Sequence, residues 1–273
     1  MNAIITAENI DYTVNSGGIF SSFETAKTIL KNISFTVEKG SLLGIAGESG
    51  SGKTTLAKII AGIIKPTKGK LEYNKELLKT NLRFSPVQIL FQNNGEILNP
   101  LREIENVIEE ALFIRFKDKT NLQKQKNAVF ESVDFPEELR KKKGFQLSGG
   151  EQQRAALARL LAVEPDVLIL DEPFSAQDPE SQLNLLNLFG KLNHEKGITM
   201  ICIAHNLQIL NKLCEKIIIM YKGEIVESGN AEEIFSSPRH EYTKFLIKAG
   251  SYNLSSAEVL SKSGKFTKTR NSI

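Results

Sequence analysis

A glycine-rich segment near the N-terminus carries the clearest chemistry of the chain. It matches the pattern G-x-x-x-x-G-K-[ST] with Gly47-Glu48-Ser49-Gly50-Ser51-Gly52-Lys53-Thr54-Thr55. Its three glycines let the backbone curl so that successive N–H groups converge on phosphate oxygens. The Lys53 ammonium reaches the outer phosphates, and the Thr54 hydroxyl is a ligand for Mg²⁺. The segment predicts a loop that binds a nucleoside triphosphate with its magnesium ion.

The flanking sequence supplies the elements that would position this loop. Residues 42–46 form an apolar run of strand length, and residues 56–63 have helical spacing. A strand, a glycine-rich turn and a helix form the context in which this pattern binds phosphate, because the free N–H groups and the positive end of the helix face the anion. A plain Gly/Ser-rich turn is the alternative interpretation, and this context disfavours it.

Strand and helix patterns alternate along the rest of the chain. Further strands are predicted at residues 3–14, 29–37, 70–73, 87–91, 167–170, 198–203, 216–221 and 224–227. A helix with Ser148 as its N-cap is predicted to continue through residues 155–163, and another at residues 180–195. A loop is predicted over residues 15–27. Such alternation implies a mainly parallel sheet covered on both faces. The predicted fold class is α/β, a RecA-like P-loop NTPase with an antiparallel β region and an inserted helical subdomain.

Two stretches depart from this alternation. Residues 101–143 are polar, helical in pattern and rich in lysine, so a helical subdomain is predicted over about residues 96–160 within an ATPase domain of residues 1–250. Residues 251–273 are rich in Ser and Lys, with no acid after Glu258. They are predicted to be a flexible basic tail, with weak contact to anionic lipid as the alternative.

The bulk properties exclude several classes of protein. The chain has 273 residues, of which 41% are hydrophobic and 25% charged, as is typical of a soluble globular protein. Its apolar runs are shorter than the roughly 18 residues of a membrane span, and no signal peptide is evident. The net charge of +3 is too small to indicate a nucleic-acid partner. Cys202 and Cys214 lack metal-like spacing, and two free thiols fit a reducing compartment. A cytosolic location is therefore expected.

Four further polar residues follow predicted strands, namely Gln92, Asp171, Glu172 and His205. Ligands of open α/β sheets bind at the carboxyl ends of the strands, where the phosphate loop also lies. We therefore expect these residues beside the triphosphate.

The complete set of motifs resembles the ATP-binding subunits of ABC transporters. In chain order the motifs are the phosphate loop, Gln92, Leu147-Ser148-Gly149-Gly150 with Gln153-Arg154, Leu170-Asp171-Glu172-Pro173, Ser175-Ala176-Gln177-Asp178 and His205. Their order and approximate spacing match the family over nearly the whole chain. Ser148 and Glu151 also form the pattern of a helix capping box.

The resemblance implies a role for each of these residues. Asp171 would hold the Mg²⁺ shell, and Glu172 would be the general base that polarises the attacking water. His205 would contact the γ-phosphate, and Gln92 would sense both Mg²⁺ and the γ-phosphate. A lone His after a strand is more often structural, but the spacing of His205 from Glu172 favours the functional role. From the residues alone, Gln92 could be an ordinary polar loop residue.

The resemblance also implies partners. Ser148, Gly149 and Gly150 would form a second anion-binding helix start. In the family this segment closes over the ATP on a second ATPase subunit, so a pair of identical or different ATPase chains is expected, with Asp178 in the loop that communicates between the two sites. The helical insertion would pass the motion to two transmembrane permeases at the cytoplasmic face of the membrane.

The adenine contact is less sharply defined by the sequence. The family stacks adenine on an aromatic residue near the end of the first strand, and Val14 aligns there. Tyr12 is two residues earlier on the same strand face, and Phe20 lies in the predicted loop. Tyr12 is the candidate, with a core or surface tyrosine as the alternative.

Three segments resemble the dipeptide, oligopeptide and nickel importers, which also use an extracytoplasmic binding protein. They are Gly47-Glu48-Ser49-Gly50, Phe91-Gln92 with Leu98-Asn99-Pro100, and Pro238-Arg239-His240-Glu241-Tyr242-Thr243. Departures from the usual residues are Glu151, Gln177, Asn206 and Asn93-Asn94, and the tail has no cysteine, so no iron–sulfur site is expected. An exporter ATPase or a soluble, non-transport ABC ATPase is the alternative function.

Overall fold

The computed structural model describes residues 2–16, 25–78, 85–92, 98–116, 121–175 and 177–250. The chain divides into two compact units, one formed by residues 1–77 and 201–273 and the other by residues 78–200. The boundary at Met200 falls inside strand β7 (Thr199–Ala204). The predicted tail and Phe20 lie outside the described residues, as do Asn93, Asn94 and Ala176.

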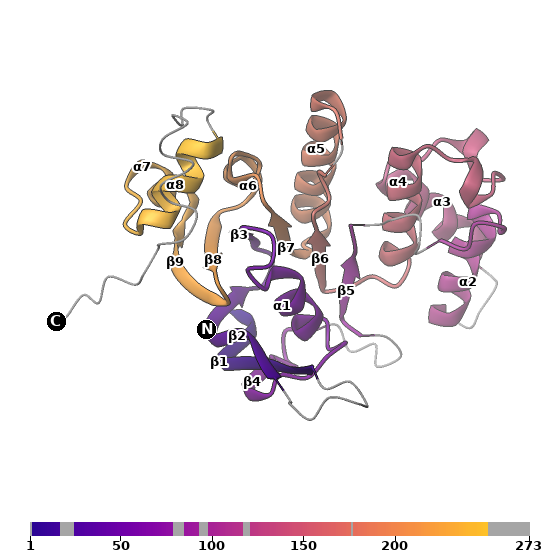
Figure 1. Ribbon diagram of the computed structural model, residues 1–273. Coiled ribbons are helices and arrows are strands. Elements are labelled where there is room, and N and C mark those ends of the chain that lie inside the picture. Colours follow the sequence, from indigo (N-terminus) through magenta and orange to yellow (C-terminus); the bar gives the residue numbers. More distant parts are fainter. Residues whose placement is uncertain are drawn as a thin grey trace. The chain divides into compact units, whose positions relative to one another are not determined.

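An antiparallel sheet in the first unit contains β1 (Ala3–Ser16), β2 (Thr25–Glu38) and β4 (Lys68–Tyr73), in the order β2-β1-β4 (Figure 1). The strands are those predicted, but the loop predicted over residues 15–27 is too long. β1 continues to Ser16, which pairs with Thr25 at the start of β2. The composition of these strand ends is polar, as in a loop, but their backbones pair and so continue the antiparallel ladder.

The first unit also holds β3 (Leu42–Gly47), β8 (Lys216–Tyr221) and β9 (Glu224–Asn230). β3 pairs with β8 in parallel, with Ile45 opposite Ile218, and β9 is antiparallel to β8. Every residue of β3 is buried, as the apolar run predicted. α1 (Lys53–Ile60) follows β3 and buries Leu56, Ile59 and Ile60.

Three further helices of the first unit were absent from the sequence prediction. They are α6 (Leu207–Leu213), α7 (Ala231–Ser236) and α8 (Glu241–Gly250). α6 packs against β3 and against both other helices. Each has ten residues or fewer, too short for helical spacing to stand out in a sequence window.

The second unit combines two parallel strands with helices. β5 (Val87–Leu90) pairs with β6 (Val167–Asp171), with Leu90 opposite Leu170. α2 (Ile104–Phe116), α3 (Leu122–Ser132) and α4 (Gly149–Leu161) pack against one another, with two short 3-10 turns, η2 (Glu137–Leu139) and η3 (Gly144–Gln146), before α4. α5 (Pro179–Lys196) follows β6. Helices in the polar stretch are thus confirmed, while the proposed limits of the helical subdomain stay a prediction.

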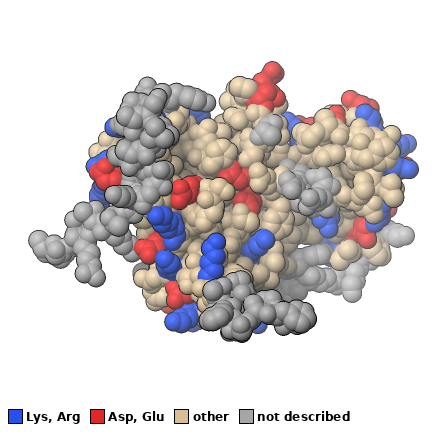
Figure 2. All heavy atoms as spheres, viewed as in Figure 1, with Lys and Arg blue, Asp and Glu red and all other residues tan. Residues whose placement is uncertain are grey.

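The charged side chains on the surface and the lengths of the helices agree with the composition and the short apolar runs of the sequence. Figure 2 shows lysine and arginine side chains interspersed with acidic ones on the drawn face. Within the described ranges, no helix combines the length and apolar character that crossing a membrane requires.

Candidate functional site

The phosphate loop between β3 and α1 has the backbone that its glycines allow. Gly52 caps α1 with a φ of 102°, a region that L side chains rarely adopt. A Cβ at Gly47 would lie 2.3 Å from the Met220 carbonyl oxygen. Glycine is therefore required at Gly47 by close approach to β8 and at Gly52 by backbone conformation.

Lys53 lies inside this loop rather than on its surface. Its Nζ donates hydrogen bonds to the carbonyl oxygens of Gly47 at 2.8 Å and Glu48 at 2.9 Å, and only 7% of the residue is exposed. Thr54, one residue further into α1, is exposed. The loop thus encloses an ammonium group and presents a hydroxyl at the helix start.

The turn between β8 and β9 forms hydrogen bonds with the phosphate loop and with β2. The Gly223 N–H donates to the Ser51 carbonyl at 3.2 Å, and the Gly223 carbonyl accepts from the Lys31 N–H at 2.8 Å. A Cβ at Gly223, where φ is +81°, would lie 2.3 Å from the Ile29 carbonyl oxygen. This single residue therefore ties the phosphate loop to β2.

The segment at residues 238–243 also reaches the loop. The Glu48 N–H donates to the Tyr242 hydroxyl oxygen at 2.8 Å. The carboxylate of Glu227 accepts the N–H groups of Arg239 and His240, at 2.8 Å and 3.0 Å. His240 Nδ1 accepts the Tyr242 N–H at 3.1 Å, so an imidazole caps α8. Sequence reasoning used this segment only as a family signal and missed its contact with the site.

We expect the cap on α8 to make stability depend on pH. Burial lowers the pKa of His240 below 6.5, against smaller opposite effects of Glu227 and Glu241. The neutral imidazole is therefore favoured in the folded state, and its stabilisation is present above about pH 6.5 and lost as pH falls through the lower folded pKa. His240→Asn keeps a capping oxygen that does not titrate, so the Tm of the parent should fall by about 2 °C more than that of the variant between pH 7.5 and 5.5.

Calorimetric scans at the two pH values measure this difference. His194→Asn, at an exposed histidine in the last turn of α5, is the matched control and should behave as the parent. Equal Tm changes in the parent and His240→Asn would contradict a titrating cap.

The second unit carries the predicted carboxylates. Asp171, the last residue of β6, is 4% exposed. Glu172 follows with a φ of 53°, an uncommon left-handed backbone for a residue with a side chain, and its Oε2 accepts the Ser175 hydroxyl at 3.0 Å. Backbone strain of this kind concentrates at functional sites. Glu172 is half-buried, so its carboxylate is oriented by Ser175 while staying accessible to solvent.

The start of α4 has the predicted capping box. The Ser148 N–H donates to Glu151 Oε2 at 2.7 Å, and Ser148 Oγ accepts the Glu151 N–H at 3.4 Å. These bonds lower the pKa of Glu151. At Gly149 and Gly150 an added Cβ would meet open space. The described part of the chain therefore gives no packing reason for two glycines here, which suits a surface that a second molecule approaches.

Gln153 connects α4 to the segment after Asp171 and Glu172. Its Nε2 donates to the Pro173 carbonyl at 2.8 Å, and its Oε1 accepts from Gln177 Nε2 at 3.2 Å. Gln153 is 1% exposed. The sequence identified Gln153 as part of the motif, but it did not predict the hydrogen bonds by which this residue positions Pro173 and Gln177.

Other predicted residues have simpler surroundings. Asp178 caps α5 by accepting the N–H groups of Glu180 and Ser181, both at 3.0 Å, and the hydroxyl of Ser181 is the main cause of its lowered pKa. Asn206 caps α6, a role for which Asn and Asp are equally suited.

Three more candidates remain to be placed. His205 is exposed directly after β7, and Gln92 is exposed after β5. Tyr12 is half-buried on β1 opposite Leu30, and its contact with adenine stays a prediction.

The candidate residues are divided between the two units. The first unit holds Tyr12, residues 47–55 and His205, and the second holds Gln92, residues 148–150 and residues 171–172. Each unit thus contains part of the set.

Comparison with known proteins supports a single family. The family model described as ABC transporter matches residues 30–175. The chain is 37% identical over 239 residues to the dipeptide transport ATP-binding protein DppF of Haemophilus influenzae, covering 85% of this chain and 73% of that protein. It is 33% identical over 247 residues to the oligopeptide transport ATP-binding protein OppF of Lactococcus lactis, covering 87% and 76%.

A solved structure agrees in fold. The ATP-binding cassette MJ0796, in a dimeric post-hydrolysis state bound to ADP and Pi, is similar with a TM-score of 0.71 and 26% identity. The match covers 83% of this chain and 98% of that one. The matched fold, the built phosphate loop and the motif set agree with one another. The chain therefore belongs to the ABC transporter family, as an ATPase subunit related to the dipeptide and oligopeptide transport ATP-binding proteins.

Proposed function

We propose that this chain hydrolyses ATP to energise peptide import through two partner permeases, at the cytoplasmic face of the membrane. The observation that carries the proposal is the built phosphate loop, in which the Lys53 ammonium lies within hydrogen-bond distance of two loop carbonyls. On ATP binding, Lys53 exchanges these carbonyls for phosphate oxygens, while backbone N–H groups at the start of α1 bind the same anion.

Magnesium would be held by residues with suitable donors. The Thr54 hydroxyl, the Asp171 carboxylate and the Gln92 amide supply oxygen, which Mg²⁺ prefers. When bound, the ion would neutralise part of the negative charge on the phosphates. Among the described residues no cluster of three or more His, Cys, Asp or Glu side chains is preassembled.

Hydrolysis would depend on Glu172 of the second unit and on His205 of the first. Glu172 accepts a proton from the attacking water and orients it, and Ser175 holds one carboxylate oxygen in place. His205 contacts the γ-phosphate from the end of β7. Gln153 positions Pro173 next to the general base.

A pair of ATPase subunits would complete each site. The start of α4 presents the backbone of Gly149 and Gly150, where an added Cβ would meet open space, which suits a triphosphate held on the other subunit. The dimeric MJ0796 cassette supports such a pair, of identical or different chains.

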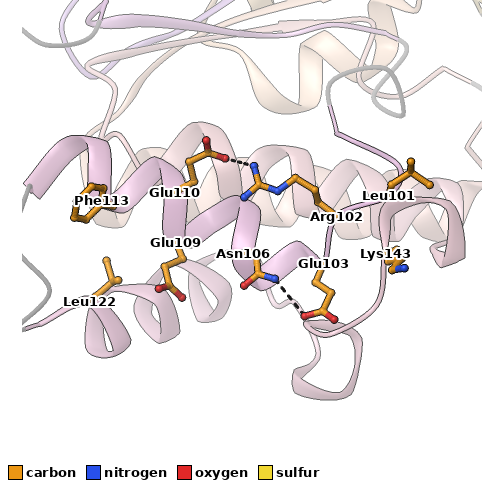
Figure 3. A pocket seen from close by; sticks show the side chains of 9 residues that line it. All are labelled: Leu101, Arg102, Glu103, Asn106, Glu109, Glu110, Phe113, Leu122 and Lys143. Atoms are coloured by element: carbon orange, nitrogen blue, oxygen red, sulfur yellow. Dashed lines mark hydrogen bonds and ion pairs between the residues drawn. The ribbon is translucent and has the colours of Figure 1, made fainter.

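The helical part of the second unit offers a surface for the permeases. A cavity of about 550 Å³ lies beside α2, and Figure 3 shows its lining side chains. Leu101 is 72% exposed and Phe113 43% exposed at this cavity, and Arg102 and Glu110, which also line it, form an ion pair. We assign it to a cytoplasmic helix of a permease, because apolar side chains beside charged ones suit an amphipathic helix.

Transport by the whole complex tests the proposal. Vesicles containing this ATPase, its permeases and an extracytoplasmic binding protein should take up di- and oligopeptides only when ATP is supplied, and a complex with Glu172→Gln should not. Nickel uptake in a parallel assay would instead place the chain with the metal importers. Export of cargo, or uptake without ATP, would contradict the proposal.

A further inference from the structure

The C-terminal helix α8 makes a direct bond to the phosphate loop. The Tyr242 hydroxyl oxygen accepts the Glu48 N–H at 2.8 Å, across 194 residues of sequence. Tyr242 is 1% exposed, and its ring lies 4.4 Å from the Tyr221 ring of β8, centroid to centroid. The tyrosine is thus fixed by packing, while its oxygen contacts the second residue of the loop.

The Glu48 residue is held at both of its backbone polar groups. Its carbonyl accepts Lys53 Nζ at 2.9 Å, and its N–H donates to Tyr242. In the proposed function, Lys53 leaves this carbonyl for the phosphates of ATP. The Tyr242 bond does not involve Lys53, so it remains to hold the entrance of the loop after the lysine has moved.

Tyr242 is itself held by a chain of hydrogen bonds that begins on β9. Glu227 accepts the N–H groups of Arg239 and His240, and His240 Nδ1 accepts the Tyr242 N–H. Burial raises the pKa of Tyr242 well above its ordinary value, so the hydroxyl stays neutral at physiological pH. The position of its oxygen is therefore set by the backbone at the start of α8.

We propose that Tyr242 is a positioning residue for ATP binding, which holds the phosphate loop in its binding conformation through the Glu48 N–H. This inference rests on the proposed binding of ATP by the loop. Its physical basis is preorganisation, because a loop that is already ordered loses less conformational freedom when the ligand binds. The ring fills space in the core, and the oxygen does the positioning.

Tyr242→Phe separates these two roles. The variant keeps the ring and removes the oxygen, leaving the Glu48 N–H without this acceptor. We expect the KM and Kd for ATP to rise by about 5- to 10-fold, as loss of one such hydrogen bond implies. Turnover at saturating ATP should stay within about twofold of the parent. Steady-state kinetics and equilibrium titration with ATP measure both quantities.

Tyr73→Phe is the matched control. The Tyr73 hydroxyl donates to the Ile60 carbonyl at 2.6 Å, at the far end of α1 from the phosphate loop. This variant also removes a phenol oxygen that bonds to backbone, so it should change Tm to a similar extent as Tyr242→Phe and leave the KM for ATP unchanged.

Four outcomes are distinguishable. A raised KM in Tyr242→Phe alone supports the positioning role. An unchanged KM in Tyr242→Phe, or an equal rise in both variants, overturns it. If the parent protein fails to bind ATP at all, the proposed function is wrong. This outcome is distinguishable from failure of the positioning role, because it is observed without any variant.

Discussion

Replacing Glu172 with glutamine is expected to lower ATP turnover by at least about 10²-fold and to leave ATP binding intact. Glutamine has the size of glutamate, and its amide oxygen can still accept the Ser175 hydroxyl that now bonds to Oε2. The substitution therefore keeps the local geometry and removes only the group that accepts a proton from water. Phosphate release under saturating ATP measures turnover, and equilibrium titration measures binding.

The control for this variant is Glu195→Gln, which makes the same change at an exposed position of α5. It should hydrolyse ATP at the parent rate. Near-normal hydrolysis by Glu172→Gln would remove Glu172 from the role of general base.

Replacing Ser148 with arginine is expected to lower hydrolysis by about 10²-fold or more without weakening ATP binding to the same chain. The arginine would occupy the space beside Gly149 and Gly150, where we place the triphosphate of the partner subunit. Binding to the phosphate loop of the variant is unaffected because that loop is formed by other residues. Turnover and ATP affinity are measured on the same preparation.

Loss of the Ser148 cap also costs about 1 kcal/mol of stability, so a second variant is needed. Gly150→Glu adds bulk and negative charge at the same surface, but it replaces glycine within a helix and should stabilise α4 by roughly 0.5–1 kcal/mol. Both variants should lose turnover although their stabilities move in opposite directions. Full turnover by either variant would contradict the shared site.

The sequence predicted those parts of the site whose chemistry is local. The phosphate loop, the capping box at Ser148 and the strand that ends in Asp171 are each contained within about ten residues, so spacing and composition suffice to predict them. The same holds for buried strands such as β3, whose apolar run is continuous.

The remaining features depend on contacts between distant residues. No local pattern indicates that Tyr242 bonds to Glu48, or that Gly223 supports Ser51. Residues 15–27 look like a loop because their composition is polar, yet backbone pairing extends both strands into them. The left-handed backbone at Glu172 is likewise set by its surroundings rather than by its side chain.

The bonds around Gly223 also bear on how the protein is made. The phosphate loop is contacted by the β8–β9 turn and by α8, which are both synthesised after residue 215, and the same turn ties the loop to β2. A nascent chain that has emerged only as far as α5 contains every residue of the loop and none of these later supports. The phosphate loop therefore gains these supporting hydrogen bonds only late in translation, after the rest of the loop has been synthesised.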